Sequence, residues 1–137
     1  PHRHIQLLRR DPSELSCPRE RWILDFDNEN YKNQRFYKNI ILKKFSKTLN
    51  KENIHEIYKV LSYKLGLGKP EIDKKPRYPY NLIFTNHWML LIKRKTDNLY
   101  GISVNALGFA GYILVTEKSD INYLKKIGPE KLLENFL

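Results

Sequence analysis

The sequence predicts an α+β protein, in which helices pack on a mostly antiparallel sheet. Three observations lead to this prediction. Two apolar segments, 80–85 and 88–93, are separated by only two residues, which is typical of a hairpin. Apolar residues recur every three or four positions within 50–65, as on one face of an amphipathic helix. The chain then ends in two segments with helical character, 120–127 and 129–137.

The first third of the chain contains fewer regular patterns. Residues 2–8 predict a strand, and the prolines within 11–18 indicate a loop. The short segment 22–26 fits either a strand or the start of a helix. The polar, Asn-rich segment 27–34 is expected to be a loop, and 36–45 mixes apolar and basic residues in a way that favours a strand.

The central helix has clear signals at both ends. Asn50 is a good N-cap, because its side chain can accept a hydrogen bond from a free backbone N–H. Gly66 and Gly68 are stop signals. Three prolines within 69–79 predict a connecting loop, and 96–98 predicts a turn or loop.

The last third begins with an apolar run, 103–115, that contains Gly108 and Gly111. Glycines in such a run favour a bend or tight packing over a phosphate-binding loop, whose spacing is absent. Pro129 fits the first turn of the last helix. Two large aromatic side chains, Trp88 and Phe109, are expected in the core.

Composition limits the functional classes. A chain of 137 residues with 41% hydrophobic and 29% charged residues has the balance of one soluble globular domain. It has no apolar run of the roughly 18–20 residues that a membrane span needs. The single Cys17 excludes an internal disulfide and a cysteine-built zinc site, and we expect a cytoplasmic protein. The net charge of +10 favours an anionic partner: a nucleotide, a polyphosphate or a nucleic acid.

Three polar side chains alternate at the start of the chain. In a strand, His2, His4 and Gln6 would share one face at a spacing of roughly 6.6–6.8 Å between neighbours. A neutral imidazole can attack phosphorus and form a covalent intermediate, and a glutamine can hold a phosphate oxygen. A metal half-site or an exposed histidine pair fits the same spacing, although His55 and His87 do not complete a metal motif.

The motif "PHRHIQLL" resembles the His-x-His-x-Gln motif of the ATP adenylyltransferases, also called diadenosine tetraphosphate phosphorylases, in the histidine-triad superfamily. "PYNLIFTNHWMLLIKR" and "GISVNALGFAGYILV" resemble the core of that family's C-terminal domain, and "YLKKIGPEKLLENF" resembles its end. The resemblance covers 1–8 and 78–137, with 9–77 similar only in outline.

The resemblance implies a fold of two histidine-triad-like halves, each an antiparallel sheet with packed helices. It implies phosphorolysis of diadenosine tetraphosphate to ATP and ADP by double displacement. His4 would be the nucleophile that carries AMP, and His2 would support it. Gln6 matches the glutamine of transferases, whereas hydrolases of the superfamily have a third histidine there, so phosphate rather than water is the expected acceptor.

Four more residues are predicted to bind the substrate: Asn81, Thr85, Arg94 and Asn105. Arg94 lies in a basic triplet suited to a polyphosphate. Structural roles in the sheet or at a hairpin end remain open for these residues. Trp88 and Phe109, which are expected in the core, have stacking on adenine as the less favoured alternative. No protein-bound metal and no organic cofactor are expected, although Mg²⁺ commonly accompanies polyphosphates.

The expected domain division places 1–21 at the end of an N-terminal catalytic half and 22–137 in a C-terminal ATP adenylyltransferase domain. The chain is therefore expected to be one piece of a longer enzyme, with the N-terminal half as its partner and dinucleoside polyphosphate, phosphate, ATP and ADP as ligands. The alternative is a nucleotide-binding module without catalytic activity. A nucleic-acid binder is the least supported hypothesis, because no recognised motif accompanies the charge, and no membrane partner is expected.

Overall fold

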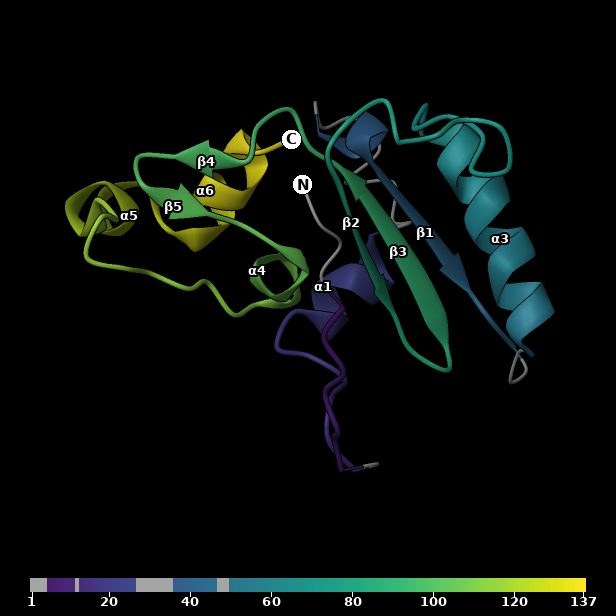
Figure 1. Ribbon diagram of the computed structural model, residues 1–137. Helices are drawn as coiled ribbons and strands as arrows, with labels where there is room; N and C mark the ends of the chain where they lie inside the picture. Colours follow the sequence, from purple (N-terminus) through teal and green to yellow (C-terminus); the bar gives the residue numbers. More distant parts are fainter. Residues whose placement is uncertain (1–4, 12, 27–35, 47–49) are drawn as a thin grey trace.

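The computed structural model describes residues 5–11, 13–26, 36–46 and 50–137 (Figure 1). Within them, the helical elements are α1 (Glu20–Asp25), the 3₁₀ turn η1 (Tyr37–Asn39), α3 (Lys51–Lys64), α4 (Ala106–Ala110), α5 (Ile121–Ile127) and α6 (Pro129–Asn135). The strands are β1 (Ile40–Lys44), β2 (Tyr80–Phe84), β3 (Trp88–Lys93), β4 (Asn98–Leu99) and β5 (Ile102–Ser103). The predicted α+β class is confirmed.

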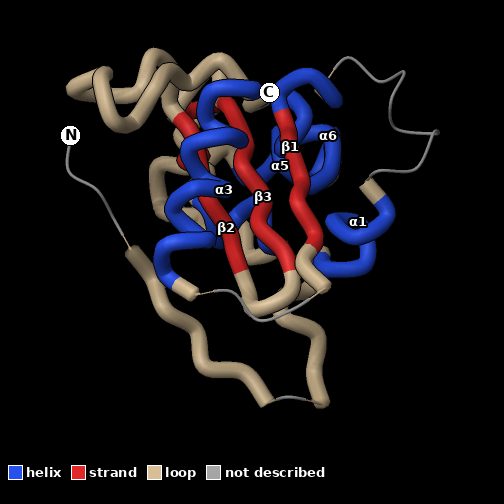
Figure 2. Tube along the Cα trace, turned by 90° about the vertical axis from the view of Figure 1, so that its right-hand side faces the viewer, coloured by secondary structure: helices blue, strands red, loops and turns tan. Residues whose placement is uncertain are grey.

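The main sheet has the order β1-β3-β2, and both pairs are antiparallel. β3 lies in the centre, with Ile92 opposite Ile40 on one side and opposite Asn81 on the other. α3 covers one face of the sheet, and α1, α5 and α6 lie behind the other face (Figure 2). β4 and β5 form a separate two-stranded hairpin.

Strand β3 supplies both hydrophobic layers, because its side chains alternate between the two faces. Met89 and Leu91 pack against α3 and the loop after it, in a smaller core with Leu61, Leu65 and Leu67. The larger core lies on the opposite face. Its buried members are Cys17, Ile23, Phe26, Ile40, Trp88, Leu90, Ile92, Ile102, Val104, Phe109, Ala110, Leu132, Leu133 and Phe136. The core positions predicted for Trp88 and Phe109 are confirmed, since they are 1% and 2% exposed.

The helix boundaries follow local capping chemistry. Asn50 accepts a hydrogen bond from the backbone N–H of Asn53 at 2.8 Å, as predicted for an N-cap. Asp120 caps α5 in the same way, accepting from the N–H of Tyr123 at 2.8 Å. Pro129 occupies the first turn of α6, as expected.

The sequence predicts a strand at 2–8, but residues 5–8, the part of it that the structure describes, do not form a strand. Residues 5–8 have no regular structure, and Ile5 and Leu7 are 86% and 91% exposed. A strand needs a partner for its backbone groups, and no described segment pairs with this one. Residues 5–11 instead run away from the sheet, and the chain returns beside them toward α1 (Figures 1 and 2). We refer to the described residues 5–11 and 13–18 as the N-terminal arm.

One other sequence prediction needs correction, and the structure adds detail for three further segments. The segment 36–45 begins as the η1 turn, so its strand starts only at Ile40. The turn predicted at 96–98 leads into the β4–β5 hairpin, whose strands are too short to produce an alternating pattern. The apolar run 103–115 contains the helix α4, and the ambiguous 22–26 lies in and just after α1.

The two glycines of the apolar run have the packing role that was predicted. A Cβ on Gly108 would lie 2.6 Å from Cγ1 of Val104, so α4 approaches the preceding segment too closely for a side chain. Gly111 ends α4 with a φ of +115°, a left-handed conformation that favours glycine.

Replacement of Gly101 is expected to test the β4–β5 turn. Gly101→Ala should destabilise the protein by more than about 2 kcal/mol, because a Cβ would lie 1.9 Å from the backbone oxygen of Lys118 and φ is +74°. Gly66→Ala is the matched control: its φ is +75°, but nothing lies within 4 Å, so only about 1 kcal/mol should be lost. Urea unfolding measures both, and equal losses would contradict the packing argument.

The carboxylate of Glu20 should make stability depend on pH. Burial opposes its charge, but hydrogen bonds from Trp88 Nε1 at 3.0 Å and from the Ser16 N–H at 2.7 Å outweigh burial and lower the pKa of Glu20. Because the folded pKa is lowered, the ionised carboxylate stabilises the fold above the unfolded pKa of about 4.3, and this is lost as pH falls through the folded pKa.

We therefore expect Glu20→Gln to be less stable than the unsubstituted chain at pH 7, with the difference shrinking below about pH 4. Urea unfolding followed by tryptophan fluorescence at several pH values measures this difference. A difference that stays constant from pH 7 to about pH 3 would contradict a stabilising ionised Glu20.

Candidate functional site

The three residues of the opening motif differ in what the structure describes. His2 and His4 lie outside the described residues. Gln6 lies on the N-terminal arm, where it is exposed and outside any regular element. The arm is held to the body by its own side chains, since Arg10 donates to the hydroxyl of Tyr112 at 3.1 Å.

Arg94 follows the end of β3 and is half-buried between the sheet and the segment before α4. One of its guanidinium nitrogens, Nη1, donates to the carbonyl of Val104 at 2.8 Å, and Nη2 lies 2.9 Å from a carboxylate oxygen of Asp97. Burial lowers the pKa of Arg94, and the negative charge of Asp97 opposes that effect. Nε is buried and has no hydrogen-bond partner among the described residues.

Asn81 lies on β2 and also has a buried polar atom without a hydrogen-bond partner among the described residues. Its strand neighbour is Ile92, whose side chain is in the larger core, so Asn81 faces the same side of the sheet as Arg94. Its side-chain oxygen, Oδ1, is buried without a partner among the described residues. A buried unmatched donor and a buried unmatched acceptor thus lie on one face of the sheet, and such groups cost about 1–3 kcal/mol each.

Asn105 completes this group from the other side. It is the N-cap of α4, with Oδ1 accepting from the N–H of Gly108 at 3.2 Å. It adjoins Val104, which accepts from Arg94, and α4 contacts β2. The structure therefore brings together three of the four residues predicted to bind substrate. We call Asn81, Arg94 and Asn105 the Arg94 group.

Thr85 lies apart from the Arg94 group. It follows the opposite end of β2, about 13 Å along the strand from Asn81. Its hydroxyl oxygen accepts from the N–H groups of His87 and Trp88, at 3.1 and 3.2 Å. These bonds fix the turn between β2 and β3, which is the structural role that remained open for Thr85.

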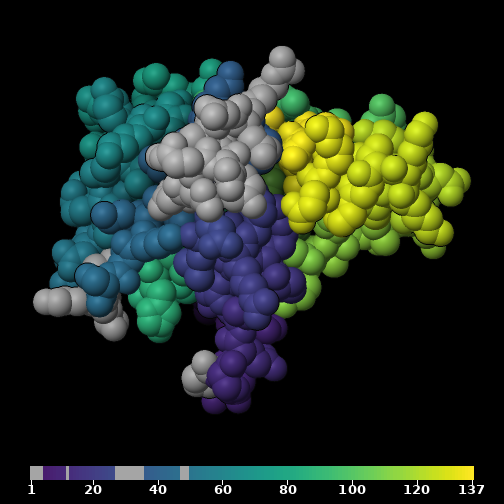
Figure 3. Space-filling view, turned by 180° about the vertical axis from the view of Figure 1, so that it is seen from behind, coloured from purple at the N-terminus to yellow at the C-terminus, as the bar shows by residue number. Residues whose placement is uncertain are grey.

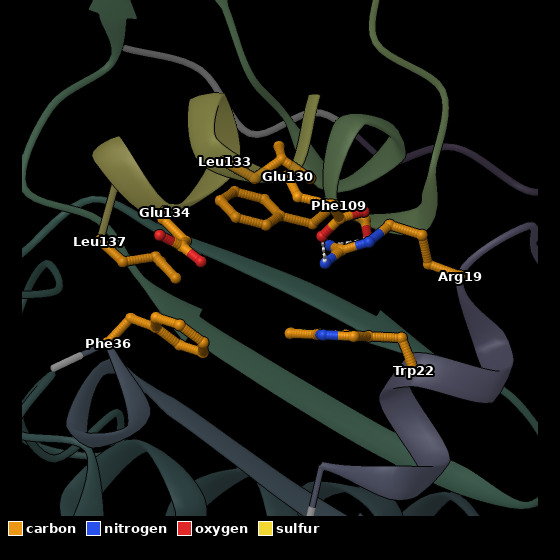
Figure 4. A pocket seen from close by; sticks show the side chains of 8 residues that line it. All are labelled: Arg19, Trp22, Phe36, Phe109, Glu130, Leu133, Glu134 and Leu137. Atoms are coloured by element: carbon orange, nitrogen blue, oxygen red, sulfur yellow. Dashed lines mark hydrogen bonds and ion pairs between the residues drawn. The ribbon is translucent and has the colours of Figure 1, made fainter. Parts of the chain in front are cut away.

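A second feature is an aromatic cleft that the sequence did not predict (Figure 4). It has a volume of about 220 Å³ and combines residues far apart in the chain. Its lining residues are Arg19, Trp22, Phe36, Phe109, Glu130, Leu133, Glu134 and Leu137. Of these, only Phe109 was singled out, as a core residue. The helices α1, α4 and α6 and the start of η1 bring the walls together, and no local motif connects them.

Arg19 ties one end of the aromatic cleft together. Its guanidinium carbon lies 3.9 Å from the ring centroid of Trp22, which is a cation–π contact. The same group forms an ion pair with Glu130 at 2.6 Å and donates to the carbonyl of Phe109 at 3.2 Å. α1, α4 and α6 are therefore joined through one side chain.

Other chemical features of the described residues carry no site. Cys17 is buried, and burial raises the pKa of its thiol, which opposes nucleophilic reactivity. Within the described ranges, no group of three or more His, Cys, Asp or Glu side chains is arranged to hold a metal ion. No helix in the described part of the chain has the length and apolar character needed to cross a membrane.

Comparison with known proteins decides the family. A model of the ATP adenylyltransferase C-terminal domain matches residues 24–136. The chain belongs to this family. No curated protein and no solved structure matches the chain. The resemblance inferred from the sequence is thus confirmed for this ATP adenylyltransferase domain, which contains the whole Arg94 group and supports a nucleotidyltransferase role.

The two asparagines of the Arg94 group should respond oppositely to substitution. Asn81→Leu should raise the free energy of unfolding by about 1 kcal/mol, because it removes an unmatched buried oxygen. Asn105→Ala should lower it by about 0.5–2 kcal/mol, because α4 loses its cap. Urea unfolding measures both. Destabilisation by Asn81→Leu would show that the Asn81 side chain is already matched in the free protein.

Proposed function

We propose that this ATP adenylyltransferase domain acts in the phosphorolysis of diadenosine tetraphosphate to ATP and ADP. The observation that carries the proposal is the family match at 24–136, preceded in the same chain by His2, His4 and Gln6. Either part alone is weaker: the motif has other uses, and the domain match does not specify a substrate.

The proposed reaction has two displacements at the same phosphorus atom. A neutral nitrogen of His4 attacks the α-phosphorus, the bond to the bridging oxygen breaks, and ATP leaves with that oxygen. AMP is then bound to His4 through a P–N bond. In the second step an oxygen of inorganic phosphate attacks the same phosphorus, the P–N bond breaks, and ADP leaves with His4 restored. His2 is proposed to orient His4.

Gln6 is proposed to hold a non-bridging oxygen of the transferred phosphoryl group. An amide donates without exchanging a proton, so it holds the phosphoryl group and does not act as a general base for water. The exposure of Gln6 on the N-terminal arm leaves its amide free to meet a ligand.

The Arg94 group is proposed to bind a hydroxyl of the nucleotide. Nε of Arg94 is an unmatched donor and Oδ1 of Asn81 is an unmatched acceptor. A ribose hydroxyl both accepts and donates, so its chemistry matches what the two atoms lack. The amide nitrogen of Asn105 and the hydroxyl proton of Thr85 are further donors proposed to contact substrate.

The remaining requirements follow from the polyphosphate. Mg²⁺ is proposed to arrive with the substrate, because its usual ligands include phosphate oxygens and water. We propose that residues 1–21 act with an N-terminal catalytic half and that 22–137 form the C-terminal domain. We also propose that the reaction occurs in the cytoplasm.

Substitution of the motif tests this proposal. The chain, together with the N-terminal catalytic half with which it is proposed to act, is incubated with diadenosine tetraphosphate, phosphate and Mg²⁺, and nucleotides are separated by chromatography. ATP and ADP are expected in equal amounts, and His4→Ala should abolish both, because it removes the proposed carrier of AMP. Gln6→His should divert AMP to water, so that AMP appears in place of ADP. Unchanged turnover in His4→Ala would refute the proposed route.

The second candidate is a nucleotide-binding module without chemistry. It is favoured by the position of Gln6, which lies on an arm outside the main sheet rather than in a strand. Saturable binding of the dinucleotide without products, in the presence of phosphate and Mg²⁺, would support this candidate over the transferase.

A further inference from the structure

We infer that the aromatic cleft binds an adenine base. The inference rests on the proposed function, which supplies two adenines in one substrate, and it assigns a base-binding role to residues outside both the opening motif and the Arg94 group. The cleft lies between the helices α1, α4 and α6 and the start of η1. Figure 4 labels the eight residues that line it.

The walls of the cleft suit a flat ring. Phe36 lies on one side of the cleft and Phe109 on the other (Figure 4). Trp22 lies on the same side as Phe36, and its ring is covered by the guanidinium of Arg19 at 3.9 Å, so the stacking walls are Phe36 and Phe109. The volume of about 220 Å³ is below the roughly 300–1,000 Å³ of pockets for drug-sized ligands, so a single ring system fits better than a whole dinucleotide. Aromatic side chains on opposite walls can stack on both faces of a base.

The charged groups of the cleft favour a base over a phosphate. Two carboxylates, from Glu130 and Glu134, line the cleft, and Arg19 is the only cation among its lining residues. The guanidinium of Arg19 is already engaged with Glu130 and with the carbonyl of Phe109. A phosphate would meet an excess of negative charge, whereas a neutral heterocycle would not.

Glu134 determines which base fits. One carboxylate oxygen, Oε2, pairs with Lys131 Nζ at 2.7 Å, and the other oxygen has no partner among the described residues. In Figure 4 this carboxylate lies near Phe36 and Phe109, at the edge of the slot. It can accept a hydrogen bond from the exocyclic amino group of adenine. Hypoxanthine has a carbonyl oxygen at that position, which a carboxylate repels.

Binding of adenosine and inosine tests the inference with ligands that carry no phosphate. Trp22 lines the cleft and reports binding there, while Trp88 is buried outside it. Adenosine is expected to quench tryptophan fluorescence saturably and to bind at least about tenfold more tightly than inosine, because a charge-assisted hydrogen bond contributes about 1.5–3 kcal/mol.

Two cleft variants distinguish the hydrogen bond to Glu134 from stacking on Phe36. Glu134→Gln should reduce the preference for adenosine to less than about threefold, because an amide can turn its donor toward the oxygen of inosine. Phe36→Leu should weaken both nucleosides by about tenfold through lost stacking. Glu117→Gln, an exposed carboxylate outside the cleft, is the control and should bind as the unsubstituted chain does. Circular dichroism confirms that each variant is folded.

The outcomes separate this inference from the proposed reaction. Two results would overturn the inference even if phosphorolysis occurs. One is that adenosine does not bind. The other is that the folded Glu134→Gln and Phe36→Leu variants bind adenosine as tightly as the unsubstituted chain does and still prefer it to inosine. Binding that depends on Glu134 and Phe36, and that persists in His4→Ala, would support it even if that chain forms no ATP or ADP.

Discussion

Strand β3 is buried on both faces, and the other elements are arranged around that constraint. Five successive side chains, Trp88 to Ile92, are nearly inaccessible to solvent. Each contributes about 1.5–3 kcal/mol when buried, so neither face of β3 can be left open. α3 covers one face, while α1, α4, α6 and the β4–β5 hairpin cover the other. The edge strands β1 and β2 satisfy its backbone on both sides.

The two ends of β3 also position the two candidate sites. At its beginning, Trp88 donates to Glu20 and so fixes α1, which carries Trp22 and is preceded by Arg19. Beyond its end, Arg94 donates to the carbonyl of Val104 and so fixes the segment that leads into α4. The aromatic cleft and the Arg94 group are consequently held by one strand from opposite ends. The space-filling view from behind shows α5 and α6 forming one lobe beside the N-terminal part of the chain (Figure 3).

Sequence reasoning was most successful where structure depends on near neighbours. The N-cap Asn50 and the β2–β3 hairpin follow from local hydrogen bonds and alternation, so a single segment is sufficient to predict them. It failed where the outcome depends on distant partners. Residues 5–8 belong to a segment predicted as a strand, but no described strand pairs with them, and α4 is too short to show helical periodicity.

The same distinction applies to the candidate sites. Asn81, Arg94 and Asn105 were each predicted to bind substrate, and the sheet brings them together. The unmatched Nε and Oδ1 atoms became visible only once burial was known. The aromatic cleft was missed because Trp22, Phe36 and Glu134 are far apart in sequence and meet only when α1, the start of η1 and α6 pack together. The catalytic roles of His2 and His4 remain proposals, because both lie outside the described residues.

The central functional claim is that His4 carries AMP, and detection of that intermediate is the most direct test. The chain, together with the N-terminal half with which it is proposed to act, is mixed with diadenosine tetraphosphate without phosphate, so that the second displacement has no acceptor. Peptides of the chain are then analysed by mass spectrometry. The account predicts one adenylyl group on the N-terminal peptide, located on His4 by fragmentation and removed when phosphate is added. Release of ATP without an adduct, or an adduct on another residue that phosphate removes equally well, would contradict it.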